Sequence, residues 1–198
     1  MRSAREQPEI LAAKLEKELC AGRIVGPFSR PPFVNFISSP LGVVPKKTPG
    51  EFHGSSVNDF IPDQFPSVQY ASIGDAITLI KSLGRACFMA KTDIKSAFRI
   101  IPIHPDDYHL LGMTWNNSYY FDRCLPIGCS SSCAIFEAFS TALEWLAKSY
   151  LCASGVLYIL DDFLFIATSQ EQCDSDLNNF LSLCDRLGVP IAHAKTEA

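Results

Sequence analysis

The chain has 198 residues, of which 47% are hydrophobic, and its formal net charge at pH 7 is −4. This length fits one ordinary domain, or one and a half, with enough apolar side chains for a substantial core, which excludes general disorder. The acidic balance excludes a free-standing, strongly basic nucleic-acid binder, but it is compatible with a catalytic core whose basic partners lie elsewhere in a longer polypeptide.

Residues 1–40 predict a helix followed by a connector. Apolar side chains recur at helical spacing over residues 8–21, with Pro8 at the start and Gly22 after the end. Residues 23–40 contain four prolines, which predicts an irregular extended segment.

Residues 41–85 predict a short strand, a loop and a second helix. The strand over residues 41–47 ends in Lys46 and Lys47, a pair that is either simply solvated or placed to bind a triphosphate. A loop over residues 54–71 precedes a helix that Ser72 can cap. The expected apolar face of this helix comprises Ile73, Ile77, Ile80 and Leu83.

From residue 86 onward, strands alternate with helices. An apolar strand over residues 86–93 ends in Asp93, and residues 99–103 resume as a strand after a turn. A hairpin is expected over residues 110–122. A helix, a second hairpin, a last helix and a short strand complete the pattern, over residues 132–150, 156–167, 169–187 and 189–191.

This order predicts an α+β fold with a βαββαβ-like plan, in which helices pack on one face of one antiparallel sheet. Two adjacent acids, Asp161 and Asp162, lie at the tip of the second hairpin. Consecutive residues on a regular strand face opposite ways, so a turn is needed to bring both carboxylates to one point. The end of strand 86–93 can lie beside this tip, and we therefore expect Asp93 to meet both acids.

Three carboxylates gathered in this way indicate a divalent-metal site. Burying like charges side by side is unfavourable unless a cation is shared between them. Mg²⁺ prefers carboxylate oxygens and leaves room for substrate phosphates. The prediction is a site for two Mg²⁺ ions, with Mn²⁺ as a substitute, that serves in-line phosphoryl transfer. The alternative is an exposed acidic turn with a structural role.

The motifs around these acids resemble those of reverse transcriptases, the RNA-directed DNA polymerases. Segments similar to polymerase motifs A, B, C and D occur in order, at Thr92–Phe98, Leu125–Phe136, Ile159–Asp162 and Leu187–Thr196. Ser39–Lys47 resembles the fingers segment that precedes the nucleotide. The sequences of these motifs closely resemble those of retrotransposon polymerases of the tyrosine-recombinase type (DIRS/Ngaro-like), and the resemblance covers residues 23–197.

The resemblance implies a fingers-and-palm polymerase fold, with an N-terminal helix over residues 1–22, partial fingers over 23–85 and a palm over 86–198. It implies an RNA or DNA template with its primer, and dNTPs, as partners. Thumb, RNase H and recombinase segments are absent from these residues and would belong to a longer polyprotein. The cysteines are scattered without a Cys-x-x-Cys pair, and the sequence shows no signal peptide and no apolar run near the ~20 residues of a membrane span. We therefore expect an intracellular protein, cytoplasmic or nuclear, that is neither secreted nor bound to a membrane.

The family's metal-binding positions fall on Asp93, Asp161 and Asp162, and the backbone carbonyl of Ile94 would help to hold a metal ion. Lys195 would protonate or neutralise the leaving pyrophosphate. The alternative for Lys195 is an exposed residue in a frayed terminus.

The nucleotide-contacting positions of the family fall on four further residues. Phe98 would clash with a ribose 2′-hydroxyl and so favour dNTPs, although a plain core position is the alternative. Gly128 would let the backbone approach the template–primer or the incoming base pair. Lys46 or Lys47 would contact the triphosphate.

The sequence also departs from the family pattern. Part of the second fingers strand is missing near residues 53–54, and His53 stands where an Arg that binds the triphosphate would begin. Ile127 and Ile159 replace a frequent polar residue of motif B and a frequent Tyr of motif C. The prediction is a retrotransposon reverse transcriptase domain, as a fragment or a degenerate copy. The alternative is a catalytically inactive remnant that binds nucleic acid or protein; motifs A and B together disfavour a nucleotide cyclase on a similar palm.

Overall fold

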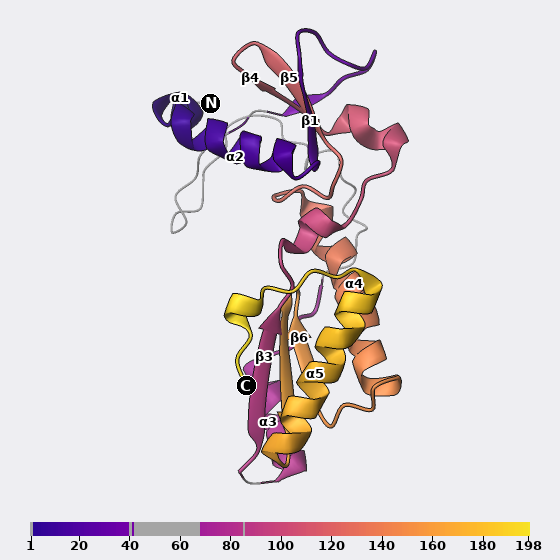
Figure 1. The fold of residues 1–198 in the computed structure, drawn as a ribbon. Coiled ribbons are helices and arrows are strands. Elements are labelled where there is room, and N and C mark those ends of the chain that lie inside the picture. The colour runs from indigo at the N-terminus through magenta and orange to yellow at the C-terminus, as the bar shows by residue number, and fades with distance from the viewer. Residues whose placement is uncertain (1, 40, 42–67, 85) are drawn as a thin grey trace. The chain divides into compact units, whose positions relative to one another are not determined.

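The computed structural model describes residues 2–39, 41, 68–84 and 86–198. The chain divides into two compact units (Figure 1). Unit 1 comprises Met1–Asp63 and Phe98–Ser132, and unit 2 comprises Gln64–Ala97 and Cys133–Ala198. The segment 98–132 is thus inserted between the two parts of unit 2, and each unit contains residues that are far apart in the sequence. The division at residues 22 and 85 into helix, fingers and palm stays a prediction.

In its described residues, unit 1 contains two helices and a four-stranded sheet. Its helices are α1 (Arg2–Glu6) and α2 (Pro8–Cys20), which confirms the predicted helix over residues 8–21. The sheet has the order β1-β5-β4-β2. Its strands are β1 (Ile24–Phe28), β2 (Ser38–Ser39), β4 (Gly112–Trp115) and β5 (Ser118–Asp122). The β4–β5 hairpin was predicted, and its turn residues Asn116 and Asn117 have φ of 47° and 57°, a conformation that asparagine tolerates.

Two predictions for unit 1 are wrong in detail. The segment 23–40 is not irregular throughout, because β1 pairs with β5 despite Pro27. Proline is tolerated there since β1 is an edge strand with a register shift between Val25 and Phe28. Residues 99–103 do not form a strand. A 3₁₀ turn, η2 (Ala97–Ile100), occupies the first part, and the positive φ of Ser96 and Ala97 turns the chain before it.

The interior of unit 1 is built from α2, the sheet and a second 3₁₀ turn, η3 (Pro105–Leu110). A buried cluster joins both helices to the sheet through Ala4, Leu11, Leu15, Ile24 and Met113. Phe121 of β5 lies at the centre of an aromatic group, with ring centroids 5.0 Å from Phe33 and 5.2 Å from Tyr108. These rings pack against the sheet on that side.

Unit 2 contains a three-stranded antiparallel sheet with the order β3-β7-β6. The strands are β3 (Phe88–Asp93), β6 (Val156–Ile159) and β7 (Asp162–Ala167). The helices are α3 (Ile73–Leu83), α4 (Ser130–Ser149), whose first turn belongs to unit 1, and α5 (Gln170–Leu187), followed by the 3₁₀ turn η4 (His193–Lys195). These elements confirm the predicted strand 86–93, the helices predicted over residues 132–150 and 169–187, and the hairpin predicted over residues 156–167.

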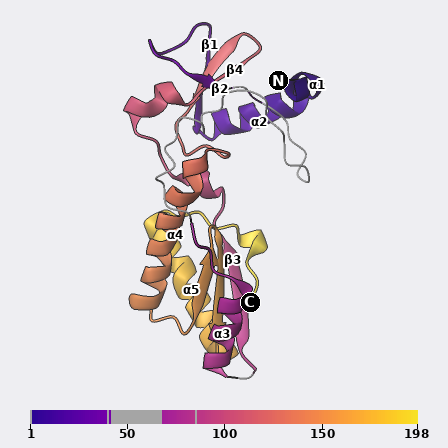
Figure 2. The same cartoon turned by 180° about the vertical axis from the view of Figure 1, so that it is seen from behind.

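Helices α4 and α5 contact the same face of this sheet. Phe163 and Phe165 of β7 pack against Phe180 of α5, with ring centroids 4.8 and 5.1 Å apart. Tyr158 lies opposite Phe163, and its hydroxyl donates a 2.8 Å hydrogen bond to Glu137 of α4. The expected packing on one face thus describes α4 and α5, whereas α3 lies on the other side of the sheet, as the two opposite views show (Figures 1 and 2).

The structure corrects three further expectations. The hairpin 110–122 does not join the sheet of the second hairpin, because it pairs with β1 and β2 in unit 1. Residues 189–191 form no strand and make an isolated bridge at Ile191. The expected apolar face of α3 is not buried: Ile73 is 81% exposed and Ile77 46% exposed. Among the described helices, none combines the length and apolar character needed to cross a membrane.

Candidate active site

The pairing of β3, β7 and β6 brings the predicted acids to one end of the sheet in unit 2. Asp93, the last residue of β3, lies directly opposite Asp162, the first residue of β7. Ile159 also pairs with Asp162, so Leu160 and Asp161 are the two turn residues of the hairpin. The amide of Ile94 donates a 2.9 Å hydrogen bond to the carbonyl of Asp161, which ties this turn to the end of β3.

The electrostatic state of the acids reflects their mutual proximity. Burial is the main cause that raises the pKa of Asp161, and the charge of Asp93 raises it further. Partial burial, followed by the charges of Asp161 and Asp93, raises the pKa of Asp162. Asp162 is nevertheless exposed to solvent, so water screens part of this effect. The carboxylates therefore favour any cation that enters the group.

Lys195 supplies positive charge at this point of the structure. Its ammonium lies 2.5 Å from Asp93 Oδ2, and although the Lys195 side chain is 65% exposed, that of Asp93 is only 8% exposed. The hydrogen bond to Asp93 raises the pKa of Lys195, opposed by a small degree of burial. The charge of Lys195 opposes the rise in the pKa values of Asp161 and Asp162, but it is too weak to cancel that rise.

The segment that carries Lys195 is held along β3 rather than frayed. The amide of Ala192 donates to the carbonyl of Asp93 at 2.8 Å. Lys91 and Glu197 exchange two backbone hydrogen bonds, and the Thr92 and Thr196 hydroxyls are 2.9 Å apart. Lys195 is therefore brought to the acids by backbone pairing along the edge of the sheet.

The side chains of Asp93, Asp161 and Asp162 carry the type of ligand atom that binds divalent metal ions. Carboxylate oxygens are the ligands that Mg²⁺ prefers, and three carboxylates of like charge with raised pKa values at two of them are suited to share a cation. In the described part of the chain, no group of three His, Cys, Asp or Glu side chains already converges as a metal cluster. Ile94 is fully buried, and its carbonyl accepts a long 3.5 Å hydrogen bond from Ala97.

The remaining predicted residues do not belong to the described part of unit 2. Phe98 and Gly128 are in unit 1, where Phe98 is half-buried rather than part of the core. Gly128 has φ of +98°, and a Cβ added there would meet no atom within 4 Å. Its glycine is thus explained by backbone conformation. Lys46 and Lys47 lie outside the described residues.

Two groups of interacting residues, one in each unit, were not identified from the sequence. Leu160 has a positive φ of 54°, and the hydroxyl of Ser140 on α4 donates a 2.7 Å hydrogen bond to its carbonyl. The available signal was the spacing of Ser140 from Phe136 and Leu143, which places a serine in the stripe of α4 that is buried. In unit 1, Arg99 contacts Glu18 and Asp122. No local pattern predicts this second group, because its members are far apart in the sequence.

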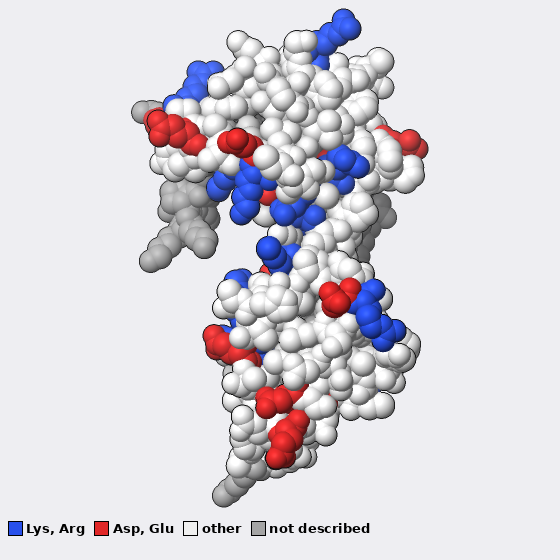
Figure 3. All heavy atoms as spheres, in the orientation of Figure 1, with Lys and Arg blue, Asp and Glu red and all other residues white. Residues whose placement is uncertain are grey.

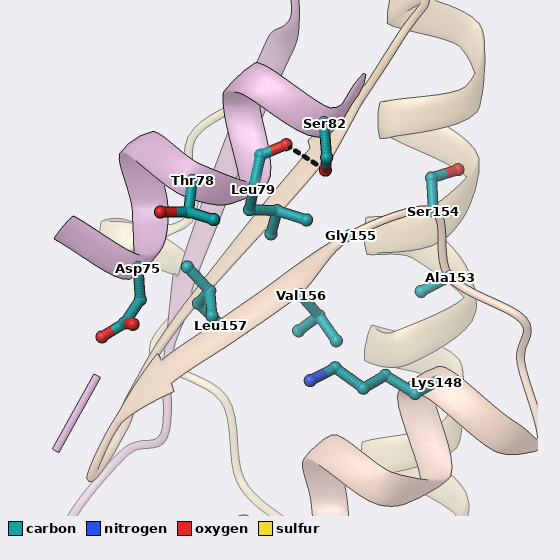
Figure 4. A pocket seen from close by; sticks show the side chains of 10 residues that line it. All are labelled: Asp75, Thr78, Leu79, Ser82, Lys148, Ala153, Ser154, Gly155, Val156 and Leu157. Carbon is teal, nitrogen blue, oxygen red and sulfur yellow. Dashed lines mark hydrogen bonds between the residues drawn. The ribbon is translucent and has the colours of Figure 1, made fainter. Parts of the chain in front are cut away.

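A pocket of about 420 Å³ lies between α3 and the start of β6, away from the acids (Figure 4). Its polar side chains already have partners: Ser82 donates to the Leu79 carbonyl, Thr78 to the Gly74 carbonyl, and Lys148 to Glu144. The carboxylate of Asp75 accepts from the Ser72 amide in the cap of α3. Most of the polar lining is therefore engaged within the fold, and the carboxylate group remains the candidate site.

A known protein family matches most of this chain. Residues 44–198 match a family described as reverse transcriptase (RNA-dependent DNA polymerase). The genome polyproteins of two isolates of Petunia vein clearing virus are each 28% identical over 140 residues, which is 70% of this chain and 6% of the polyprotein. The chain thus spans a small part of these curated relatives.

Solved structures show the same fold. The foamy viral protease-reverse transcriptase in complex with dsDNA gives a TM-score of 0.69 at 20% identity, over 96% of this chain and 37% of that chain. The native prototype foamy virus protease-reverse transcriptase gives 0.56 at 22% identity, over 71% of this chain and 17% of that chain. At these identities the likeness establishes the fold, which is a mixed α and β polymerase domain.

Proposed function

The chain belongs to the reverse transcriptase (RNA-dependent DNA polymerase) family, and from this premise we propose that it provides the nucleotidyl-transfer site of a template-directed DNA polymerase. The observation that carries the proposal is the meeting of Asp93, Asp161 and Asp162 at one end of the unit 2 sheet. Its substrates would be dNTPs and a primer paired to an RNA or DNA template.

In this proposal Asp93, Asp161 and Asp162 would hold two divalent ions, with help from the Ile94 carbonyl. When bound, such ions lower the pKa of the attacking hydroxyl and neutralise the charge on the leaving group. The primer 3′-oxygen forms a bond to the α-phosphorus, the bond from that phosphorus to the bridging oxygen breaks, and pyrophosphate leaves. Lys195 lies beside Asp93 and would donate a proton to the pyrophosphate or neutralise it. Phe98, Gly128 and Lys46 or Lys47 would contact the nucleotide and the template–primer.

The face of the sheet on the side of α3 is only partly covered and is the face suited to nucleic acid. Asp93 and Asp162 share this face, and Met89, four residues before Asp93 on the same side of β3, is 54% exposed. The opposite face is covered by α5, over which acidic side chains gather (Figure 3). An acidic surface repels phosphates, so the template–primer would approach on the side of the carboxylates.

The finer assignment is a retrotransposon of the tyrosine-recombinase type (DIRS/Ngaro-like), and it rests on the wording of motifs A to D. The chain spans 6% of the petunia virus polyproteins, so thumb, RNase H and recombinase segments would be supplied by a longer polyprotein. The competing function is a catalytically inactive remnant that binds nucleic acid or protein. The shortened fingers near residues 53–54, which lie outside the described residues, favour that alternative.

Primer extension tests the proposal. The 198-residue chain is incubated with an RNA template, a DNA primer, dNTPs and Mg²⁺ or Mn²⁺, beside Asp161→Asn. We expect extension by the wild type and a loss of at least about 1,000-fold in the variant, since a metal-binding carboxylate is removed. A folded wild-type chain that extends no primer when template–primer is in excess would leave the inactive remnant as the function.

A further inference from the structure

The turn that carries the acids adopts a backbone conformation that is unfavourable for its sequence. Leu160 occupies the first of the two turn positions with φ of 54°. Tight hairpin turns of types I′ and II′ both require a positive φ at this position, which glycine, asparagine or aspartate usually supplies. A leucine keeps this conformation only where the surrounding structure holds it.

Two hydrogen bonds hold the turn from different elements. The hydroxyl of Ser140 on α4 donates to the Leu160 carbonyl at 2.7 Å, and the Ile94 amide donates to the Asp161 carbonyl at 2.9 Å. Ser140 is 0% exposed, so water has no direct access to the carbonyl bond from that side. Neighbouring turns of the same helix stripe are equally buried, with Phe136 at 0% and Leu143 at 2%.

We propose that Ser140 is a positioning residue for the metal-binding carboxylates. Its bond to the Leu160 carbonyl fixes the backbone from which Asp161 and Asp162 project, and therefore the distance of both from Asp93. The inference rests on the proposed function, since it assigns the serine a role toward the metal ions rather than toward the fold alone. Buried hydrogen bonds that orient ligand-bearing groups typically change metal affinity 10–100-fold when they are removed.

A purely structural serine makes a different prediction. If the hydroxyl only satisfied a carbonyl in the contact between α4 and the hairpin, its removal would lower thermal stability and leave metal affinity unchanged. The two roles are therefore separated by measuring Mn²⁺ binding and unfolding on the same protein samples.

The first experiment is a calorimetric Mn²⁺ titration of the 198-residue chain and of Ser140→Ala. We expect the dissociation constant to rise about 10-fold in the variant. In primer extension, kcat should fall while the KM for dNTP changes little, because the nucleotide contacts are elsewhere. Thr141→Val is the matched control: it removes the neighbouring hydroxyl of α4, which contacts Tyr158 of β6 at 2.7 Å but not the turn, and should keep the wild-type Mn²⁺ affinity.

The second experiment replaces Leu160, so that the positive φ of the turn becomes less unfavourable. Asparagine tolerates a positive φ better than leucine, so Leu160→Asn makes the turn less dependent on the Ser140 hydrogen bond. We therefore expect Ser140→Ala to reduce Mn²⁺ affinity less when it is introduced into Leu160→Asn than when it is introduced into the wild type. If Ser140→Ala does not fold, Ser140→Cys replaces it, because the thiol keeps the volume and a weaker donor.

The outcomes separate the two proposals. A Mn²⁺ dissociation constant within twofold of wild type in the folded serine variant, together with full additivity in the double variant, would overturn the role of Ser140 while leaving the proposed function intact. A wild-type chain that neither binds Mn²⁺ nor extends a primer would overturn the proposed function and this inference together.

Discussion

The two units bury acidic side chains in opposite ways. In unit 1, Asp122 and Glu18 accept hydrogen bonds from Arg99, whose guanidinium also donates to the Cys124 and Leu125 carbonyls. In unit 2, three carboxylates lie at the same end of the sheet, and the ammonium beside Asp93 belongs to a side chain that is 65% exposed. Unit 1 neutralises its buried charge within the fold, whereas unit 2 leaves like charges together. Like charges placed close together are typical of a cation-binding site rather than of a structural core.

The pKa shifts express the same difference. Burial raises the pKa of Asp122, and the Arg99 guanidinium opposes this rise. Burial lowers the pKa of Arg99, but its bonds to Asp122 and Glu18 outweigh that effect and raise it. At Asp162, by contrast, burial and both neighbouring carboxylates act in the same direction. Removal of the cation of each group in turn, followed by measurement of the free energy of unfolding, tests this difference between the units.

Arg99→Met should produce the largest change. The Arg99 and Asp122 side chains are 9% and 11% exposed, so the variant leaves a buried carboxylate without its partner. We expect a loss of about 3 kcal/mol in the free energy of unfolding, measured by urea denaturation. Arg23→Met is the control, because Arg23 pairs with Glu18 at 23% exposure and should lose about 1 kcal/mol or less. Equal losses in both variants would remove the distinction between a buried and a partly exposed pair.

The second-largest effect should be a change in the pH dependence of the free energy of unfolding. Because the pKa values of Asp161 and Asp162 are raised in the folded chain, the folded state binds protons more readily than the unfolded state. The stability contributed by these groups is present at low pH and is lost as pH rises from about 4 through their raised pKa values. The double variant Asp161→Asn, Asp162→Asn should flatten this part of the curve, measured as unfolding free energy without metal. An unchanged slope would mean that neither burial nor the neighbouring carboxylates raise the pKa values of Asp161 and Asp162 in the folded chain.

Lys195→Met should have the smallest effect on stability. The Lys195 side chain is 65% exposed, although that of Asp93 is only 8% exposed, so removal of the ammonium should lower the melting temperature less than Arg99→Met does. Mn²⁺ should bind a few-fold more tightly, because the ammonium no longer competes for Asp93. Lys91→Met serves as the control, since Lys91 pairs with the exposed Glu197 and not with the acids. Weaker Mn²⁺ binding in Lys195→Met than in Lys91→Met would show that the lysine supports the metal site instead of competing with it.

The elements that position the acids could be predicted because their signals are local. Ser72 and Asp75 form a capping box, Ser169 caps α5, and Gly188 ends α5 with φ of 72°. The apolar runs of β3, β6 and β7 are bounded by polar residues, which gives strands of the right length. The adjacency of Asp93 to the hairpin tip followed from the predicted order of strands and helices.

The partners of distant segments could not be predicted. Nothing within 23–40 indicates that β1 pairs with β5, almost a hundred residues later, because the proline that argues against a strand is acceptable at an edge. The same limit explains why both hairpins were assigned to one sheet. The same holds for α4, in which the apolar Ile135 is 41% exposed while the polar Ser140 is buried against the turn.

The interleaving of the two units has a consequence for synthesis on the ribosome. Unit 1 has all of its described strands once residue 122 has emerged, since β1 pairs with β5. Strand β3 is made before that but pairs with β7, which ends at Ala167. At roughly 5–20 residues per second, an apolar strand with two open edges therefore waits several seconds for its neighbour. During nascent-chain folding, the strand that ends in Asp93 is the segment of unit 2 most in need of protection by a chaperone.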